Sequence, residues 1–167
     1  DGVFYHSNTM STAQIQAFLN AKVPNCDTNG TQPYGGTTRA AYAASRGYPG
    51  PFTCLRNYYE NPTTHENNLS GRAIPNGGIS AAQIITNVST AYSINPQVLI
   101  ALIEKEQGLI SDDWPWTSQY QSATGYGCPD TNVCNSQYYG FYNQVYNAAR
   151  QFQLYRNNPN SYNYLAG

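Results

Sequence analysis

The stretch that most constrains the fold runs from Asn95 to Gly108 and reads NPQVLIALIEKEQG. Asn95 is a favourable helix N-cap, the proline after it is tolerated in a first helical turn, and Gly108 is typical of a helix end. We therefore predict one helix between these two residues. Successive residues advance by about 100° around a helix axis. The apolar side chains of this segment then form a single stripe, and Glu106 falls near its centre.

Glu106 is the main candidate for a catalytic group. A carboxylate on a core-facing stripe is disfavoured by desolvation unless it is paired or opens onto a cleft, and burial favours the protonated form that a general acid needs. Glu104 falls on the opposite side of the same helix. The alternative is that the last turn of the helix emerges from the core. In that case Glu106 is a solvated residue at a helix end.

Charged residues are few for a chain of 167 residues. Asp, Glu, Lys and Arg make up 10% of the sequence, against roughly 25% in soluble proteins. Uncharged groups, including 19 Asn and 16 Tyr, must therefore supply much of the polar surface. The net charge of -1 disfavours binding to nucleic acid. No apolar run approaches the roughly 20 residues of a membrane span, and no motif indicates a cofactor. We expect a monomer that binds no cofactor or metal.

Four cysteines favour two disulfides, Cys26 with Cys54 and Cys128 with Cys134, because each pair encloses a turn-rich segment that a covalent link would order. The alternatives are metal binding or free thiols. Zinc sites use pairs two to four residues apart, whereas the closest cysteines here have five residues between them. Disulfides predict an extracytoplasmic protein.

The first half of the chain contains one clear helical signal. Residues 10–19, MSTAQIQAFL, hold a Ser followed three residues later by Gln, which predicts a capping box and a short amphipathic helix. Between residues 24 and 78, Gly, Pro, Asn and Thr interrupt every helical period except in 38–45. We expect a long irregular segment there, tied by Cys26 and Cys54, with room for a small β-hairpin.

Helical signals dominate the second half. Ser80 and Gln83 form a second potential capping box, and apolar residues continue at helical spacing to residue 92. A last long helix is predicted over residues 138–156, and residues 157–167 read as a tail. The predicted fold class is mainly α, as a single domain over residues 1–167 with its helical core at 80–156.

Aromatic residues follow soon after the helix that ends at Gly108. Pyranose faces are apolar and stack on aromatic rings, while uncharged amides bind sugar hydroxyls. Either tryptophan is equally compatible with the core or with a lid over a cleft. We predict a sugar-binding cleft beside Glu106 that is lined by Trp114, Trp116, Tyr120, Tyr126, Gln107 and Tyr139.

Glycoside cleavage also needs a second carboxylate in enzymes that activate water or form a covalent intermediate. Asp112, Asp113 and Asp130 are the candidates. We rank Asp130 first because the loop between Cys128 and Cys134 would hold it rigidly, and Asp112 is the next choice.

The segment from Ile94 to Gly108 resembles the catalytic helix of the lysozyme-like superfamily, most closely that of soluble lytic transglycosylases and goose-type lysozymes. In that family the helix carries a glutamate that acts as general acid, and Glu106 occupies its place. Residues 122–127, SATGYG, look like the glycine-rich stretch beneath the family's cleft, and residues 144–152 look like its closing helix. The resemblance implies a lysozyme-like fold and cleavage of peptidoglycan between N-acetylmuramic acid and N-acetylglucosamine.

The sequence departs from the family in two places. Gln107 stands where family members usually have Ser, and the Gly-Leu-Met-Gln signature is absent. Only the role of Glu106 therefore carries over. Lytic transglycosylases use one glutamate and the acetamido group of the substrate, so the resemblance does not require a second carboxylate. The whole chain also looks like uncharacterised domains of secreted cell-wall proteins of Gram-positive bacteria, which implies a secreted, wall-associated protein.

Three functions follow as hypotheses. The first is a peptidoglycan-cleaving enzyme, either a muramidase or a lytic transglycosylase, with Glu106 as its acid. The second is a non-catalytic wall-binding module that keeps the fold, in which Trp114 covers Glu106. The third is a chitinase-like hydrolase, since chitin also exposes N-acetylglucosamine.

Overall fold

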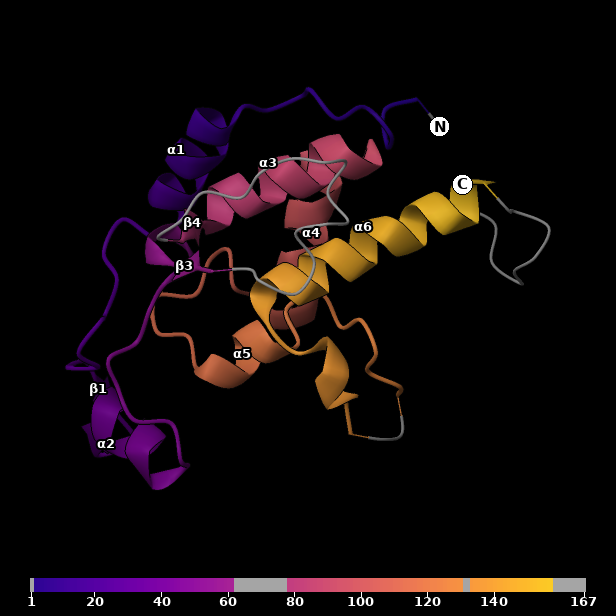
Figure 1. Cartoon of the computed structure of the whole chain (residues 1–167). Coiled ribbons are helices and arrows are strands. Elements are labelled where there is room, and N and C mark those ends of the chain that lie inside the picture. Colours follow the sequence, from indigo (N-terminus) through magenta and orange to yellow (C-terminus); the bar gives the residue numbers. More distant parts are fainter. Residues whose placement is uncertain (1, 62–77, 131–132, 158–167) are drawn as a thin grey trace.

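The architecture is mainly helical, with α3 in contact with most of the other long helices. The computed structural model describes residues 2–61, 78–130 and 133–157. The helices in chain order are α1 (Thr12–Lys22), α2 (Arg39–Ser45), α3 (Ala81–Tyr92), α4 (Pro96–Gln107), α5 (Thr117–Gln121) and α6 (Phe141–Asn157). Short 3₁₀ turns occur at η1 (Leu55–Asn57) and η3 (Ser136–Tyr138). α3 packs against α1, α4 and α6, whereas α2 and α5 lie below this group in the view of Figure 1.

The predicted starts of the helices that follow Ser11 and Ser80 are confirmed by their caps. The Ser11 hydroxyl accepts from the Gln14 amide, and the Gln14 side chain accepts in return from the Ser11 amide, which completes the predicted capping box of α1. Ser80 caps α3 by accepting from the Gln83 amide, but only this half of the second predicted capping box is present, and the Gln83 side chain donates to Asn87 instead. Local side-chain chemistry therefore fixes where both helices begin.

α4 begins and ends as the sequence predicts. The Asn95 side chain accepts from the Gln97 amide at 2.9 Å, and Gly108 adopts a left-handed conformation with φ of 64°. Asn95 is only 2% exposed, and it also joins α4 to the N-terminal segment. Its side chain accepts from the Thr9 hydroxyl at 2.7 Å and donates to the Val3 carbonyl at 2.9 Å.

The first half of the chain contains the predicted hairpin. β1 (Pro33–Tyr34) pairs antiparallel with β2 (Thr37–Thr38) across two glycines. A second antiparallel pair, which the sequence does not predict, joins β3 (Tyr59–Glu60) to β4 (Ile79–Ser80). Both predicted disulfides are present, Cys26–Cys54 and Cys128–Cys134. Residues 62–77 of the predicted irregular segment and 158–167 of the predicted tail lie outside the described residues.

The last helix starts later than the sequence predicts. α6 begins at Phe141 rather than at residue 138. Residue 138 is instead the last residue of η3, and Gly140 takes φ of 111°, which is incompatible with a helix. The core that α6 closes is aliphatic and aromatic. Its fully buried members include Ile15, Leu19, Ile84, Ile85, Leu99, Ile103 and Phe141. In the part of the chain that the structure describes, no helix combines the length and apolar character needed to cross a membrane.

Candidate functional site

Glu106 lies in the last turn of α4, and its side chain is exposed. Of the two interpretations of its position, the structure agrees with the second, in which the last turn of the helix emerges from the core. Its direction around the helix matches that of Leu99 and Ile103, which are fully buried. Burial on this face of α4 nevertheless ends at Ile103, so that the same face reaches solvent at Glu106.

The Glu106 carboxylate lies against the backbone of Gly125. A Cβ atom at Gly125 would stand 2.7 Å from Oε2 of Glu106 and 3.0 Å from its Cδ. Gly125 also has φ of 75°, which disfavours any residue with a side chain. Glycine is therefore required here twice over, for the backbone conformation and for the space that the carboxylate occupies.

Gln144, on α6, holds the turn beneath this glycine. Its side chain is fully buried, and its Oε1 accepts from the amides of Thr124 and Tyr126, both at 3.1 Å. Its Nε2 donates to the carbonyls of Tyr126 at 2.9 Å and Tyr138 at 2.7 Å. With each polar atom of the amide bonded at least twice, the 124–126 turn has a fixed position relative to α6.

The residues around this turn include three of the predicted sugar contacts. Gln107 donates to the Ser122 hydroxyl at 3.0 Å, so its amide is engaged in joining α4 to the turn. Tyr126 packs edge-on against Tyr138 with 5.0 Å between ring centroids. The Tyr139 hydroxyl donates to the Cys134 carbonyl at 3.4 Å. The predicted site residues thus fall into two groups. The first group consists of Glu106 and the residues around the glycine-rich turn.

The acidic residues proposed as partners of Glu106 have different surroundings. Both oxygens of Asp112 are occupied, because Oδ1 accepts from the Trp114 amide and Oδ2 from Gln119, each at 2.8 Å. Gln119 also donates to the Gln107 carbonyl at 3.0 Å. Asp112 therefore shapes the connection between α4 and α5. Asp130 is exposed in the loop closed by Cys128 and Cys134.

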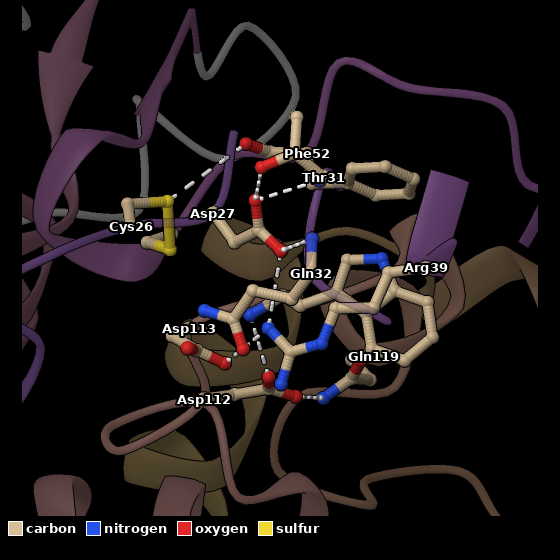
Figure 2. A network of polar contacts seen from close by, with 11 residues as sticks. Cys26, Asp27, Thr31, Gln32, Arg39, Phe52, Asp112, Asp113 and Gln119 are labelled. Atoms are coloured by element: carbon tan, nitrogen blue, oxygen red, sulfur yellow. Dashed lines mark hydrogen bonds and ion pairs between the residues drawn. A yellow bond between two sulfur atoms is a disulfide. The ribbon is translucent and has the colours of Figure 1, made fainter. Parts of the chain in front are cut away.

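Asp113 belongs to an ion-pair network that joins the two halves of the chain (Figure 2). Arg39, at the start of α2, donates to Asp113 at 2.9 Å and to Asp27 at 3.3 Å. The Asp27 amide donates to the Asp113 carbonyl at 2.8 Å. The Arg39 guanidinium also lies 5.0 Å from the centroid of the Trp114 ring. These contacts fix the first half of the chain against the α4–α5 connection.

Burial of the Asp27 carboxylate acts to raise its pKa. Backbone hydrogen bonds from Thr31 and Gln32, together with the Arg39 guanidinium, outweigh burial and hold the pKa of Asp27 below its ordinary range. Asp27 is therefore a stably ionised anchor of the network.

The two tryptophans belong to an aromatic cluster. Trp114 packs against Tyr34, Phe52 and Trp116, with ring centroids 5.3 to 6.0 Å apart. The side chain of Tyr48 stacks on Trp116 at 4.8 Å and an interplanar angle of 23°. Trp114 therefore has its own partners in this cluster and is not placed as a cover for Glu106.

A cavity of about 350 Å³ opens between residues 48–59 and 115–120, and we call it the aromatic cavity. Tyr120 lies at its base, 7% exposed, and donates its hydroxyl to the Thr53 carbonyl at 2.5 Å. Burial raises the pKa of Tyr120, so this phenol stays protonated as a donor. The cavity is lined by Tyr48, Pro49, Pro51, Phe52, Thr53, Asn57, Tyr58, Tyr59, Pro115, Trp116, Thr117 and Tyr120.

The predicted single cleft is thus divided between two places. Trp116 and Tyr120 line the aromatic cavity, while Gln107 and Tyr126 lie at the glycine-rich turn with Glu106. The sequence analysis did not identify Gln144 as a residue that holds the turn. Its position on the buried face of a predicted helix indicates that its amide must be hydrogen-bonded inside the protein. That residues 24–78 form a wall of a cleft is one of two roles the sequence leaves open for them, and no local pattern in 48–59 indicates which segment they face.

Together, the fold and the site define a small, mainly helical, disulfide-bonded domain with an exposed carboxylate beside a glycine-rich turn. The model of one protein family, described as the LasA N-terminal domain, matches residues 1–161. The chain belongs to this family. No curated protein and no solved structure matches the chain.

Proposed function

We propose that the protein is a secreted, lysozyme-like enzyme that cleaves the glycan strands of peptidoglycan, with Glu106 as its general acid. One observation carries the proposal. The Glu106 carboxylate lies against the backbone of Gly125, in a turn that the buried Gln144 holds in place. A general acid must have a fixed position relative to the bond it protonates. This turn provides that position at the place where the resemblance to lytic transglycosylases puts the catalytic glutamate.

In the proposed reaction Glu106 donates a proton to the glycosidic oxygen as the bond to the anomeric carbon breaks. Its exposure lets a sugar strand reach the carboxylate directly. A sugar bound over Glu106 excludes bulk water from the reacting bond.

The second step has two routes. In a transglycosylase, the substrate's own hydroxyl and acetamido group complete the reaction, and Glu106 is the single catalytic carboxylate. In a hydrolase, a second carboxylate assists water, and Asp130 is the better choice because Asp112 already accepts two hydrogen bonds.

The proposed location is outside the cytoplasm, in association with the cell wall, and the protein acts as a monomer. Two disulfides support this location, because such bonds form and persist in oxidising compartments. The low charge of the chain also agrees with a glycan rather than a nucleic acid as partner.

The test is the clearing of suspended peptidoglycan by the wild type and by Glu106→Gln, with mass analysis of the released products. We expect the variant to be slower by at least about 10²-fold, the usual contribution of a general acid. Anhydro ends would identify a transglycosylase, and reducing ends a hydrolase. Purified chitin, assayed in parallel, separates the chitinase alternative.

Glu104→Gln is the matched control. Glu104 lies on the same helix and is also exposed, but it accepts hydrogen bonds from Ser111. Its loss should leave the clearing rate within about twofold. Equal rates for the wild type and Glu106→Gln, or no clearing by any form, would reject Glu106 as the acid. Sedimentation with the wall without product release would favour the wall-binding module.

A further inference from the structure

We propose that the aromatic cavity is a binding site for an uncharged pyranose ring, separate from Glu106. Its lining does not include Glu106 or the turn at Gly125. One of its walls, residues 48–59, lies outside the part of the chain that resembles lysozyme-like enzymes. The binding itself does not depend on catalysis, so the site exists whether the protein is an enzyme or a wall-binding module.

The lining of the cavity is uncharged, and this favours a neutral ligand. None of the residues that line the cavity is an Asp, Glu, Lys, Arg or His. Burial raises the pKa values of Tyr58 and Tyr120 well above neutral pH, and the Tyr58 hydroxyl also bonds to Glu60. These phenols therefore add no charge, and an anionic or cationic ligand finds no counter-charge on the walls.

Flat rings give the cavity the surface that a sugar face needs. Tyr59 is 67% exposed, so one side of its ring is accessible to a ligand. Tyr48 and Trp116, stacked on each other, add a rigid aromatic wall. The volume of about 350 Å³ lies near the lower end of the range of about 300–1,000 Å³ for small-molecule sites. One pyranose ring of a glycan fits this volume, and its neighbouring rings would lie outside the cavity.

Polar groups at the cavity can bind the hydroxyls of that ring. Asn57, Thr53 and Thr117 are all exposed lining residues, and they carry one amide and two hydroxyl groups. Such uncharged donors and acceptors are also suited to an acetamido group. An aromatic and proline-rich lining also binds polyproline helices in other proteins, but those ligands are extended. The test below includes one.

The walls are held in place before a ligand arrives. The Cys26–Cys54 disulfide ties residues 48–59 to the rest of the segment, and the Phe52 amide donates to the Thr28 carbonyl at 2.8 Å. The Tyr120 hydroxyl joins the two walls through Thr53. Binding to a fixed cavity costs less conformational entropy than binding to a mobile one.

One short helix connects the cavity to the turn beside Glu106 along the chain. Trp116 is the N-cap of α5, and the turn that contains Gly125 follows the C-terminal end of the same helix. A five-residue helix spans only about 7.5 Å at 1.5 Å per residue. If the proposed function holds, a glycan anchored in the cavity is bound by a segment that continues directly into the turn beside Glu106.

The experiment measures binding of chitotriose by NMR titration and by the change in tryptophan fluorescence, using the full chain. Wild type and Glu106→Gln should bind with the same affinity. Tyr59→Ala should weaken binding roughly tenfold, as expected for the loss of a main contact residue. Because Tyr59 is mostly exposed, its removal should leave the fold intact, which circular dichroism checks.

Tyr34→Ala is the matched control, because Tyr34 is 42% exposed in the neighbouring aromatic cluster but does not line the cavity. It should bind chitotriose as the wild type does. The proposal is overturned if the wild type does not bind, if Tyr59→Ala binds unchanged, or if decaproline binds and chitotriose does not. Loss of affinity in Glu106→Gln alone would place the ligand at the other site and also overturn it.

Discussion

At the scale of single residues, the turn at Gly125 is shaped by the side chains of Gln144 and Glu106. Gln144 binds the backbone of the turn through both ends of its amide. Glu106 occupies the space that a Cβ atom at Gly125 would need. The position of the Glu106 carboxylate therefore depends on Gly125 and Gln144, neither of which has an acid–base role.

Gly125→Ala tests this dependence. The added methyl group would lie 2.7 Å from Oε2 of Glu106, and alanine at φ of 75° costs about 1–2 kcal/mol. We expect a loss of stability of that size and a fall in peptidoglycan clearing of at least about tenfold, because the carboxylate must move. The measurements are urea unfolding and the clearing rate.

Gly47→Ala separates strain from displacement. Gly47 has φ of 89°, but a Cβ atom there would meet nothing within 4 Å. This variant should lose a similar amount of stability and keep its activity. Equal activity in the two variants would show that the contact between Gly125 and Glu106 does not position the carboxylate.

Asp27 gives a prediction for pH. Its pKa in the folded protein lies below the usual value, despite burial, because of its hydrogen bonds and Arg39. The contribution of Asp27 to stability is thus fully present above the unfolded pKa of about 3.9 and is lost as the pH falls through the lower folded pKa. We expect the wild type to lose stability below about pH 4, and Asp27→Asn to lose less over the same interval. Urea unfolding between pH 7 and pH 2.5 measures both; parallel curves would contradict the prediction.

At the scale of elements, the sequence predicts helix ends where the cap is local and fails where a distant partner decides. Ser11, Ser80 and Asn95 each cap a helix with an oxygen that lies two or three residues from the amide it accepts from. In contrast, β3 exists only because β4 pairs with it from the far side of residues 62–77. Local composition carries no information about that pairing.

The caps differ in what they hold, and this predicts a difference in stability. Asn95 caps α4 and also binds Thr9 and Val3 in a buried position, whereas Ser11 caps α1 at the surface. Ser11→Ala should cost about 1 kcal/mol, the usual value for an N-cap. Asn95→Ala should cost at least about 2 kcal/mol, because buried partners are also left unsatisfied. Urea unfolding measures both, and equal costs would contradict the role assigned to Asn95.

At the scale of the whole molecule, the candidate site depends on how far the core extends. The periodicity of α4 correctly places Glu106 in line with Leu99 and Ile103, but it contains no information about where the core stops. The aromatic cavity is formed by segments that are more than fifty residues apart. Their approach depends on Arg39, Asp27 and Asp113, which no spacing rule connects.

Each of the two disulfides lies beside one of the two proposed sites. Removing one disulfide should therefore affect both the stability of the protein and the site beside it. Cys26–Cys54 separates its cysteines by 28 residues and ties a wall of the aromatic cavity, whereas Cys128–Cys134 spans 6 residues just after the turn at Gly125. On the loop-entropy model, removal of the first bond costs about 3.5 kcal/mol and removal of the second about 2 kcal/mol.

We therefore expect the double variant Cys26→Ala/Cys54→Ala to unfold at lower urea than Cys128→Ala/Cys134→Ala. The first should lose most of its affinity for chitotriose, because one wall of the cavity is no longer tied, while the second should retain it. For peptidoglycan clearing the order should be the opposite, with the larger loss in Cys128→Ala/Cys134→Ala, when both variants are assayed well below their unfolding midpoints. If either variant loses binding and clearing in equal proportion, the two sites are not independent, and the cavity belongs to the same cleft as Glu106.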